Sequence, residues 1–375
     1  MGFDRSDNRI NLTVSIAKKD KSLMRVTHCP KLHFLTRKQI DDLAWNRCVD
    51  EAHNTLVYGH TWYLDAVTNV PGWRWEGLVL PHQQGAGYAA VLPVPLRKRW
   101  GRWVVYQPLF CQFLAIFSPQ PLDPATFLDA LGRRHRYASS LHLLLPEPRP
   151  ALPDWVQTKM AFTYVLPLTT AQGDTLHRPI PHAQLATRYT PDRRMNLRRA
   201  IRRTSEAPDW QFVDGDTIDS LLALFRENHA DAIGVGDWAY ALLQAVFTAL
   251  RRQGIGQLRY ACVAGKPVAG ALFVVANGRI IYLFNAANAE GRRLNARTLL
   301  LDEAIAEATK KATASPLLLD FESPHKPGVV AFYQSFGAVP QAYAVLNWSR
   351  LTRLERLGQQ GFNWLGSAVS SLKQT

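Results

Sequence analysis

The sequence predicts an α/β chain that contains two copies of one unit. Helical and strand patterns follow each other in the same order twice, over residues 62–168 and 238–348. Each copy reads as a helix, three strands, a helix, a strand, a short helix and a final strand, and the first copy has one more short strand at 114–118. The pair Asn277–Gly278 adds a strong hairpin signal to the second copy. A chain of 375 residues has room for about two such domains.

The spacing of apolar residues defines the individual elements. In the first copy, we expect helices at 62–67, 124–137 and 155–160, and strands at 75–80, 88–93, 103–107, 114–118, 141–145 and 162–168. In the second copy, we expect helices at 238–253, 296–313 and 329–336, and strands at 256–263, 268–276, 279–285, 317–321 and 343–348. The chain then divides into a loose polar tail (1–23), a first unit (24–185), a second unit (186–349) and a C-terminal helix (350–375).

Composition narrows the class of protein. Hydrophobic residues make up 47% of the chain, which excludes disorder over its whole length. The net charge of +14 predicts a surface that attracts phosphates, whether of nucleic acid, a nucleotide-bearing cofactor or an anionic membrane. No apolar run is long enough to span a membrane, and no secretory signal is visible. The four cysteines form no CxxC pair, so we expect reduced thiols in a cytoplasmic protein and no metal site.

Three short segments of the sequence resemble a known superfamily. Residues 331–338 read AFYQSFGA, similar to the segment after the fifth strand of GNAT acyltransferases. Residues 319–323 read LDFES, which resembles the corresponding strand end of FemAB-like domains. Residues 193–200 read RRMNLRRA, similar to the R-x-N-x-x-x-A segment that lies between the two units of those proteins. Over about 30–348, the chain therefore resembles tandem GNAT acyltransferases of the FemAB/FemX-like type.

This resemblance implies both a fold and an activity. The fold is α/β (α+β), with two tandem GNAT-like units that are each a mixed, mainly antiparallel sheet flanked by helices. The activity is N-acyl transfer, by direct attack in a ternary complex, from acetyl-CoA or another acyl-CoA to the amine of a small molecule or a cell-wall precursor. Two alternatives stay open: aminoacyl transfer from charged tRNA to a peptidoglycan-type amine, and a catalytically inactive GNAT-like binding scaffold. The oligomeric state is also open.

The loop before residue 296 is the predicted site for the acyl donor. A helix N-terminus favours phosphate, and Asn295 is suited to cap it. Asn295 stands where the central glycine of the superfamily's Q/R-x-x-G-x-G/A loop is expected. The strand 279–285 should splay from 317–321, which opens a gap for the donor. The predicted donor-binding residues are Tyr282, Asn285, Arg292, Arg293, Asn295, Ala296, Arg297 and Thr298.

Three side chains are candidates for catalysis. Asp320 and Glu322 alternate along a strand end and so point to one side. A carboxylate beside the donor can accept a proton from an attacking amine. The resemblance to GNAT acyltransferases implies that Tyr333 donates a proton to the departing thiolate. The structural alternatives are that Asp320 pairs with a basic neighbour and that Tyr333 packs in the core.

The acceptor side is predicted from two loops. His229 and Trp238 flank the glycine-containing segment 234–236, which is suited to form a flap between two helices. His325 and Lys326 lie in the proline-bracketed loop 323–328, which can line the acceptor cleft.

An arginine-rich stretch at 188–203 has two readings. Its arginines Arg194, Arg198 and Arg202 share one helical face, while Leu197 and Ile201 mark the buried side. Such a face can bind tRNA, CoA phosphates or a phosphorylated acceptor, or it can simply be solvated. We expect the first unit to support the fold and acceptor binding through Trp62, Tyr63, Gln107, Pro108 and Gln112.

Overall fold

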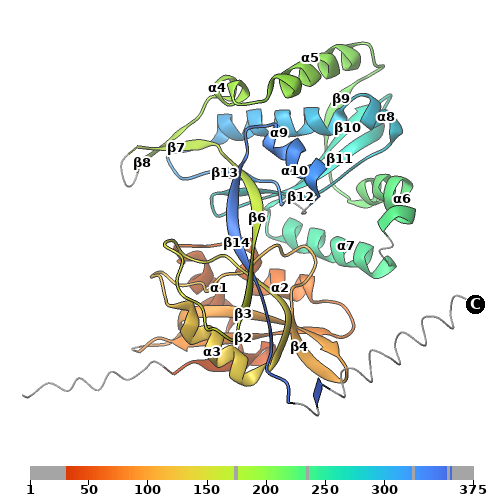
Figure 1. Cartoon of the computed structure of the whole chain (residues 1–375). Helices are drawn as coiled ribbons and strands as arrows, with labels where there is room; N and C mark the ends of the chain where they lie inside the picture. Colours follow the sequence, from red (N-terminus) through yellow and green to blue (C-terminus); the bar gives the residue numbers. More distant parts are fainter. Residues whose placement is uncertain are drawn as a thin grey trace, which may run out of the picture. The chain divides into compact units, whose positions relative to one another are not determined.

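The computed structural model describes residues 31–83, 85–172, 176–233, 236–322, 326–352 and 355–356. The predicted tail 1–23 lies outside these residues, as does most of the predicted helix 350–375. In the described part, the α/β fold contains one twelve-stranded, mostly antiparallel sheet with helices on its faces (Figure 1). Every helix of this part falls short of a membrane span in length or in apolar character.

The first half of the fold runs from β1 to β6. Its elements are β1 (His33–Thr36), η1 (Arg37–Gln39), α1 (Asp42–Asp50), η2 (Val57–Gly59), α2 (Thr61–Val67), β2 (Trp73–Pro81), β3 (Tyr88–Arg99), β4 (Arg102–Tyr106), α3 (Pro124–Arg134), β5 (Tyr137–Leu143) and β6 (Gln157–Pro167). A small connecting region follows, with β7 (Thr169–Gln172), β8 (Leu176–Pro179) and α4 (His182–Thr187).

The second half runs from α5 to β14. Its elements are α5 (Pro191–Ser205), β9 (Gln211–Gly215), α6 (Asp219–Ile233), α7 (Asp237–Arg252), β10 (Gly256–Val263), β11 (Lys266–Ala276), β12 (Arg279–Ala287), α8 (Ala289–Arg293), α9 (Ala296–Lys311), β13 (Leu318–Asp320), α10 (Pro327–Gln334) and β14 (Val339–Ser349). The predicted hairpin is present: Asn277 and Gly278 have φ values of 52° and 69°, as a type I′ turn requires.

The final strands of the two halves are exchanged, so the two units share a single sheet. The strand order is β1-β2-β3-β4-β5-β14-β6-β13-β12-β11-β10-β9. β6 of the first half pairs with β13 of the second half, and β14 of the second half pairs with β5 of the first. β6 and β14 also pair with each other from Val339↔Val165 to Asn347↔Gln157, and they run side by side in Figure 1.

Two predicted elements are wrong, and strand pairing explains both. Residues 114–118 form no strand: only Leu114 and Phe117 make isolated bridges, to Leu143 and Val91. Residues 155–160 form no helix, because β6 already begins at Gln157 and pairs with β14 there. Long-range pairing with a strand that comes almost two hundred residues later is invisible to local periodicity.

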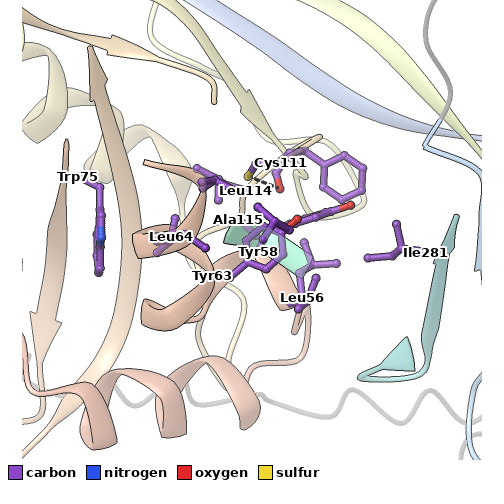
Figure 2. Packing of buried hydrophobic residues seen from close by; sticks show 14 of the residues in the cluster. Leu56, Tyr58, Tyr63, Leu64, Trp75, Cys111, Leu114, Ala115 and Ile281 are labelled. Carbon is purple, nitrogen blue, oxygen red and sulfur yellow. Dashed lines mark hydrogen bonds between the residues drawn. The ribbon is translucent and has the colours of Figure 1, made fainter. Parts of the chain in front are cut away.

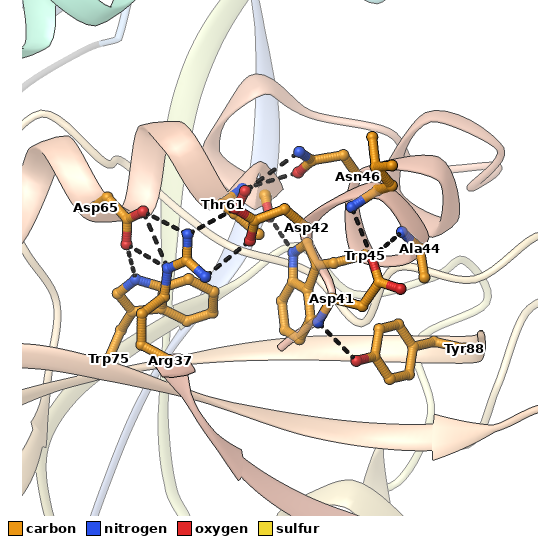
Figure 3. Close-up of polar contacts among 12 residues, drawn as sticks. Arg37, Asp41, Asp42, Ala44, Trp45, Asn46, Thr61, Asp65, Trp75 and Tyr88 are labelled. Carbon is orange, nitrogen blue, oxygen red and sulfur yellow. Dashed lines mark hydrogen bonds and ion pairs between the residues drawn. The ribbon is translucent and has the colours of Figure 1, made fainter. Parts of the chain in front are cut away.

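A network of hydrogen bonds and ion pairs connects the first helices to the sheet. The Arg37 guanidinium binds both the Asp65 carboxylate of α2, at 2.7 Å from Nε to Oδ1, and Asp42 of α1. The Trp75 indole on β2 donates to the same Asp65 at 2.7 Å (Figure 3). This network fixes α2 and the preceding η2, which matters because η2 carries a residue of the site.

Candidate active site

The site lies where β12 and β13 separate. Their parallel pairing runs from Arg279↔Leu318 to Ile281↔Asp320, after which β13 ends while β12 continues to Ala287. β12 also contains an extra residue, Leu283, because Phe284 pairs with Leu272 while Tyr282 pairs with Phe273. A bulge of this kind re-aims the strand locally. The two strands thus pair over three residues, and β12 extends beyond the end of β13.

The turn before α9 has a left-handed residue at its centre. Asn295 has φ 55° and ψ 35°, and its side chain makes no capping hydrogen bond, so the expected side-chain cap is wrong. The backbone carbonyl of Asn295 instead accepts from Thr298 N at 3.0 Å. Asparagine tolerates this conformation better than most residues other than glycine. The substitution of the superfamily's glycine by Asn295 therefore leaves the turn and the open helix end in place.

Three predicted residues meet beside that helix end. Arg297 Nη1 donates to Asn285 Oδ1 at 3.2 Å, which links α9 to β12. The Asn285 side chain also lies close enough to Tyr333 of α10 to lower the pKa of its phenol. Tyr333 is buried, and this burial raises the pKa of its phenol to about 12. Its ring stacks on Phe321 with centroids 4.6 Å apart and meets Tyr282 edge-on at 6.3 Å.

The other donor-site candidates are placed differently. Arg292 Nη1 bonds the Ala287 carbonyl at 3.1 Å, and Arg293 is exposed near Glu290. Ala296 is fully buried in the first turn of α9. Thr298 is also buried, and its hydroxyl accepts from a residue of α5, Arg193, at 2.9 Å.

Arg193 is a residue that the sequence reasoning missed. Only 9% of it is exposed, yet none of the ion pairs among the described residues includes it. Its guanidinium lies over the rings of Phe332 and Phe336, at 4.4 and 4.7 Å, and its Nε donates to Ser335 at 2.8 Å. It therefore joins α5, the first turn of α9 and the helix that carries Tyr333.

The buried stripe of α5 differs from the predicted one. The buried residues of the helix are Arg193, Leu197, Ala200 and Thr204, which recur at helical spacing. Ile201, predicted to be buried, is 57% exposed. The prediction marked the buried side by Leu197 and Ile201 and did not assign Arg193 to it, but the planar guanidinium of Arg193 stacks on aromatic rings and so belongs to the packed face.

The two candidate carboxylates have different surroundings. Asp320 is fully buried, and its Oδ2 accepts from Arg279 at 2.5 Å while its Oδ1 accepts from Thr163 at 2.5 Å. Asp320 Oδ1 also accepts from the Glu322 backbone N–H at 3.0 Å. Both oxygens of Asp320 are therefore engaged by the protein, and one of them holds the backbone of Glu322.

Glu322 lies two residues beyond the end of β13 and is half-buried. Its backbone is left-handed, with φ 45°, a conformation that non-glycine residues seldom adopt outside strained or functional sites. Burial raises the pKa of its carboxyl group to about 8, and the Asp320 carboxylate adds to this. A hydrogen bond from Tyr58 and the charge of Arg279 act in the opposite direction.

Tyr58 comes from the first half of the chain, and sequence reasoning did not single it out. Its hydroxyl donates to Glu322 Oε1. Figure 2 shows Tyr58 beside Tyr63 and Cys111, with Ile281 of β12 facing this group. A single sequence gives no signal for a contact between residues 264 positions apart.

The acceptor candidates are only partly described. Trp238 lies at the start of α7 and is 43% exposed. Lys326 is exposed at the N-terminus of α10, where its carbonyl accepts from Val329 N. His325 lies outside the described residues, and so does the side chain of His229.

The chain is similar to known proteins in one domain model and in its fold. Residues 191–315 match the family model described as an acetyltransferase (GNAT) domain. The fold is similar to the crystal structure of FemX, with a TM-score of 0.57 and 11% identity over 83% of this chain and 96% of that one. No curated protein sequence matches the chain.

Two further solved structures show weaker similarity. One is a tandem GNAT protein from the clavulanic acid biosynthesis pathway (TM-score 0.46, 12% identity, 84% of this chain and 98% of that one). The other is L-PGS from Bacillus licheniformis (TM-score 0.44, 12% identity, 87% and 97%).

The fold is therefore that of a tandem GNAT protein of the FemX-like type. Within its second half, residues 191–315 match the acetyltransferase (GNAT) domain model.

Proposed function

We propose that the second half binds an acyl donor and that Glu322 accepts the proton of an attacking amine. One observation carries this proposal: the Glu322 carboxylate, whose pKa burial raises to about 8, lies two residues beyond the end of β13, where the pairing of β13 with β12 has ended. A general base works best when its pKa is close to the operating pH. Asp320 is less suited to this role, because Arg279 and Thr163 occupy its oxygens.

The donor side fits a ligand that carries phosphates. The N-terminus of α9 presents backbone N–H groups and the positive end of a helix dipole. The buried charge of Arg193 adjoins this turn through Thr298, and Arg297 lies in it. A bound anion at this turn stabilises both the arginine charge and the positive end of the helix dipole. Asn295, Ala296 and Arg297 would hold the diphosphate of an acyl-CoA, which supplies the activated acyl group.

Two side chains of the protein would then each transfer one proton. Glu322 accepts the proton that the amine loses as its nitrogen bonds to the acyl carbon. Tyr333 gives a proton to the sulfur as the carbon–sulfur bond breaks. A phenol pKa of about 12 keeps Tyr333 protonated and ready to donate at neutral pH. The acceptor is an amine of a small molecule or a cell-wall precursor, in a cytoplasm that suits the buried thiols of Cys48, Cys111 and Cys262.

The arginines of α5 favour a second candidate, aminoacyl transfer from charged tRNA to a peptidoglycan-type amine. Arg198, Arg199 and Arg202 are all exposed on this helix. Phosphate contacts of this kind weaken steeply as salt rises. Salt dependence therefore separates a tRNA donor from a CoA donor.

The test is a thermal-shift titration of the full chain with acetyl-CoA, CoA and total charged tRNA at two salt concentrations. A ligand that binds only the folded state raises the unfolding midpoint. We expect a salt-tolerant shift with both CoA ligands that is lost in Asn295→Asp, which adds a negative charge where the phosphates bind. A salt-sensitive shift with tRNA alone would replace CoA by tRNA as donor. If none of the three ligands raises the unfolding midpoint, the result would favour the binding scaffold and contradict the proposal.

A further inference from the structure

We propose that Tyr58, from the first half of the chain, is a positioning residue for the catalytic carboxylate of Glu322. The active site would then be complete only when both halves are folded together. This inference rests on the proposed role of Glu322 as the base. It goes further, because it assigns a task to the half that lacks the acetyltransferase domain match.

The Tyr58 side chain is held firmly on its own side of the contact. The residue is fully buried in η2. Its ring meets Tyr63 edge-on at 5.4 Å and Phe113 at 6.0 Å between centroids. The next residue, Gly59, lies so close to Phe117 that a Cβ atom there would come within 2.5 Å of the ring. The backbone that carries Tyr58 therefore has little freedom to move.

Glu322 is fixed at two points, one from each half of the protein. Its backbone N–H donates to Asp320, which in turn is bound by Arg279. Its Oε1 accepts from Tyr58. Because Oε1 is engaged, Oε2 is the oxygen that takes the proton from the amine. The bond to Tyr58 thus decides which oxygen faces the acceptor.

Several titratable or charged groups surround the Glu322 carboxylate. They are Tyr58, Tyr63 and Cys111 of the first half, and Arg279, Asp320, Tyr333 and Tyr343 of the second. Among these side chains, Tyr58 is the one that hydrogen-bonds the Glu322 carboxylate within the described residues. A donated hydrogen bond stabilises the charged carboxylate. Removing it leaves burial and Asp320, which favour the protonated form, opposed by the charge of Arg279.

The chain offers a matched control. Tyr63 is also fully buried and also touches the ring of Tyr58, but its hydroxyl donates to the Phe110 carbonyl. Tyr58→Phe and Tyr63→Phe therefore each remove one buried hydroxyl from the same cluster. Only the first removes a bond to Glu322.

The experiment is an infrared titration of the protonated carboxyl band in the full-length protein. Glu322→Gln assigns the band, and no donor or acceptor is needed. We expect Tyr58→Phe to raise the midpoint of this band by about one pH unit, the size of a typical hydrogen-bond effect on a carboxylate, while Tyr63→Phe leaves it unchanged. Equal midpoints in the two variants would overturn the proposal.

Two further measurements keep the outcome interpretable. If Tyr58→Phe fails to fold, Glu322→Asp withdraws the carboxylate from Tyr58 by one methylene and should shift the assigned band in the same direction. Acyl transfer by Glu322→Gln tests the proposed function separately. Full activity of that variant would refute Glu322 as the base, whereas loss of activity together with an unmoved band in Tyr58→Phe would refute only the role of Tyr58.

Discussion

Arg279 Nη1 and Asp320 Oδ2 form a buried ion pair at 2.5 Å between β12 and β13. It joins the first paired residue of β12 to the last paired residue of β13. Arg279 Nη2 also donates to Gln341 of β14 at 3.0 Å, so the pair connects three strands. Asp320 also accepts a hydrogen bond from the Glu322 backbone N–H. The ion pair therefore helps to hold the proposed base in position.

Asp320→Asn should destabilise the protein strongly. The substitution leaves the Arg279 guanidinium buried without its counter-charge, and breaking one side of such a pair costs about 3–5 kcal/mol. Urea unfolding at pH 7 measures this loss. Glu307→Gln is the control, because its pairs with Arg259 and Lys311 are more exposed, and we expect a loss of less than about 1 kcal/mol. Equal losses would show that the Asp320 pair is no more important than a surface contact.

Activity should rise with pH through about 8. Glu322 must be deprotonated to accept a proton, and its pKa of about 8 places the midpoint there. The measurement is kcat/KM against pH with an amine that the enzyme accepts. Repeating it with an amine of lower pKa separates the titration of Glu322 from that of the acceptor. A midpoint that follows the amine would rule out this assignment.

Glu322 should also make stability fall as pH rises. Its pKa is about 8 in the folded protein, above the value of about 4.3 for an unperturbed glutamate. The folded state therefore binds the proton more tightly, and stability is lost between these two pH values. Each pKa unit corresponds to about 1.4 kcal/mol, so the loss amounts to a few kcal/mol.

Glu322→Gln should remove this slope. We expect the variant to gain free energy of unfolding over the wild type at pH 9 relative to pH 5. Glu303→Gln, on the exposed side of α9, is the control and should follow the wild type. If the free energy of unfolding changes with pH in the same way in all three proteins, the result would contradict a raised pKa of Glu322 in the folded protein.

Substitutions of Asn295 should depend on backbone conformation. With φ 55° and no side-chain cap, Asn295→Gly keeps the left-handed turn and should retain stability and donor binding. Asn295→Ala should lose about 1 kcal/mol and weaken donor binding, because alanine resists this conformation. Thermal unfolding with and without acetyl-CoA tests both variants. Better binding by the alanine variant than by the glycine variant would refute the role of the turn.

Gly291 should not tolerate a side chain. A Cβ atom there would come within 2.1 Å of the Val268 carbonyl oxygen on β11, so Gly291→Ala must displace α8 from the sheet. We expect a loss of about 1–3 kcal/mol, typical of overpacking, measured by urea unfolding. Gly328→Ala is the matched control, since nothing lies within 4 Å of its Cβ position in α10. That variant should be neutral or gain about 0.5–1 kcal/mol from helix propensity.

The sequence predicted those parts of the fold that depend on local spacing. The strand 256–263 and the hairpin at Asn277–Gly278 were predictable, because neighbouring residues determine them. The cluster of Asn285, Arg297 and Tyr333 followed from a superfamily resemblance. By contrast, Tyr58 and Arg193 act through contacts between distant segments, and a single sequence holds no signal for such pairing.

The exchanged strands have a consequence for synthesis on the ribosome. β14 lies between β5 and β6, and its residues Val339–Ser349 are translated after every other strand of the described residues. A nascent chain that has released everything through β6 therefore still has an unpaired edge on β5. Unpaired edges invite association with other chains, and contacts of long sequence separation form slowly. The first half of the fold thus completes its part of the sheet only after Ser349 has been translated.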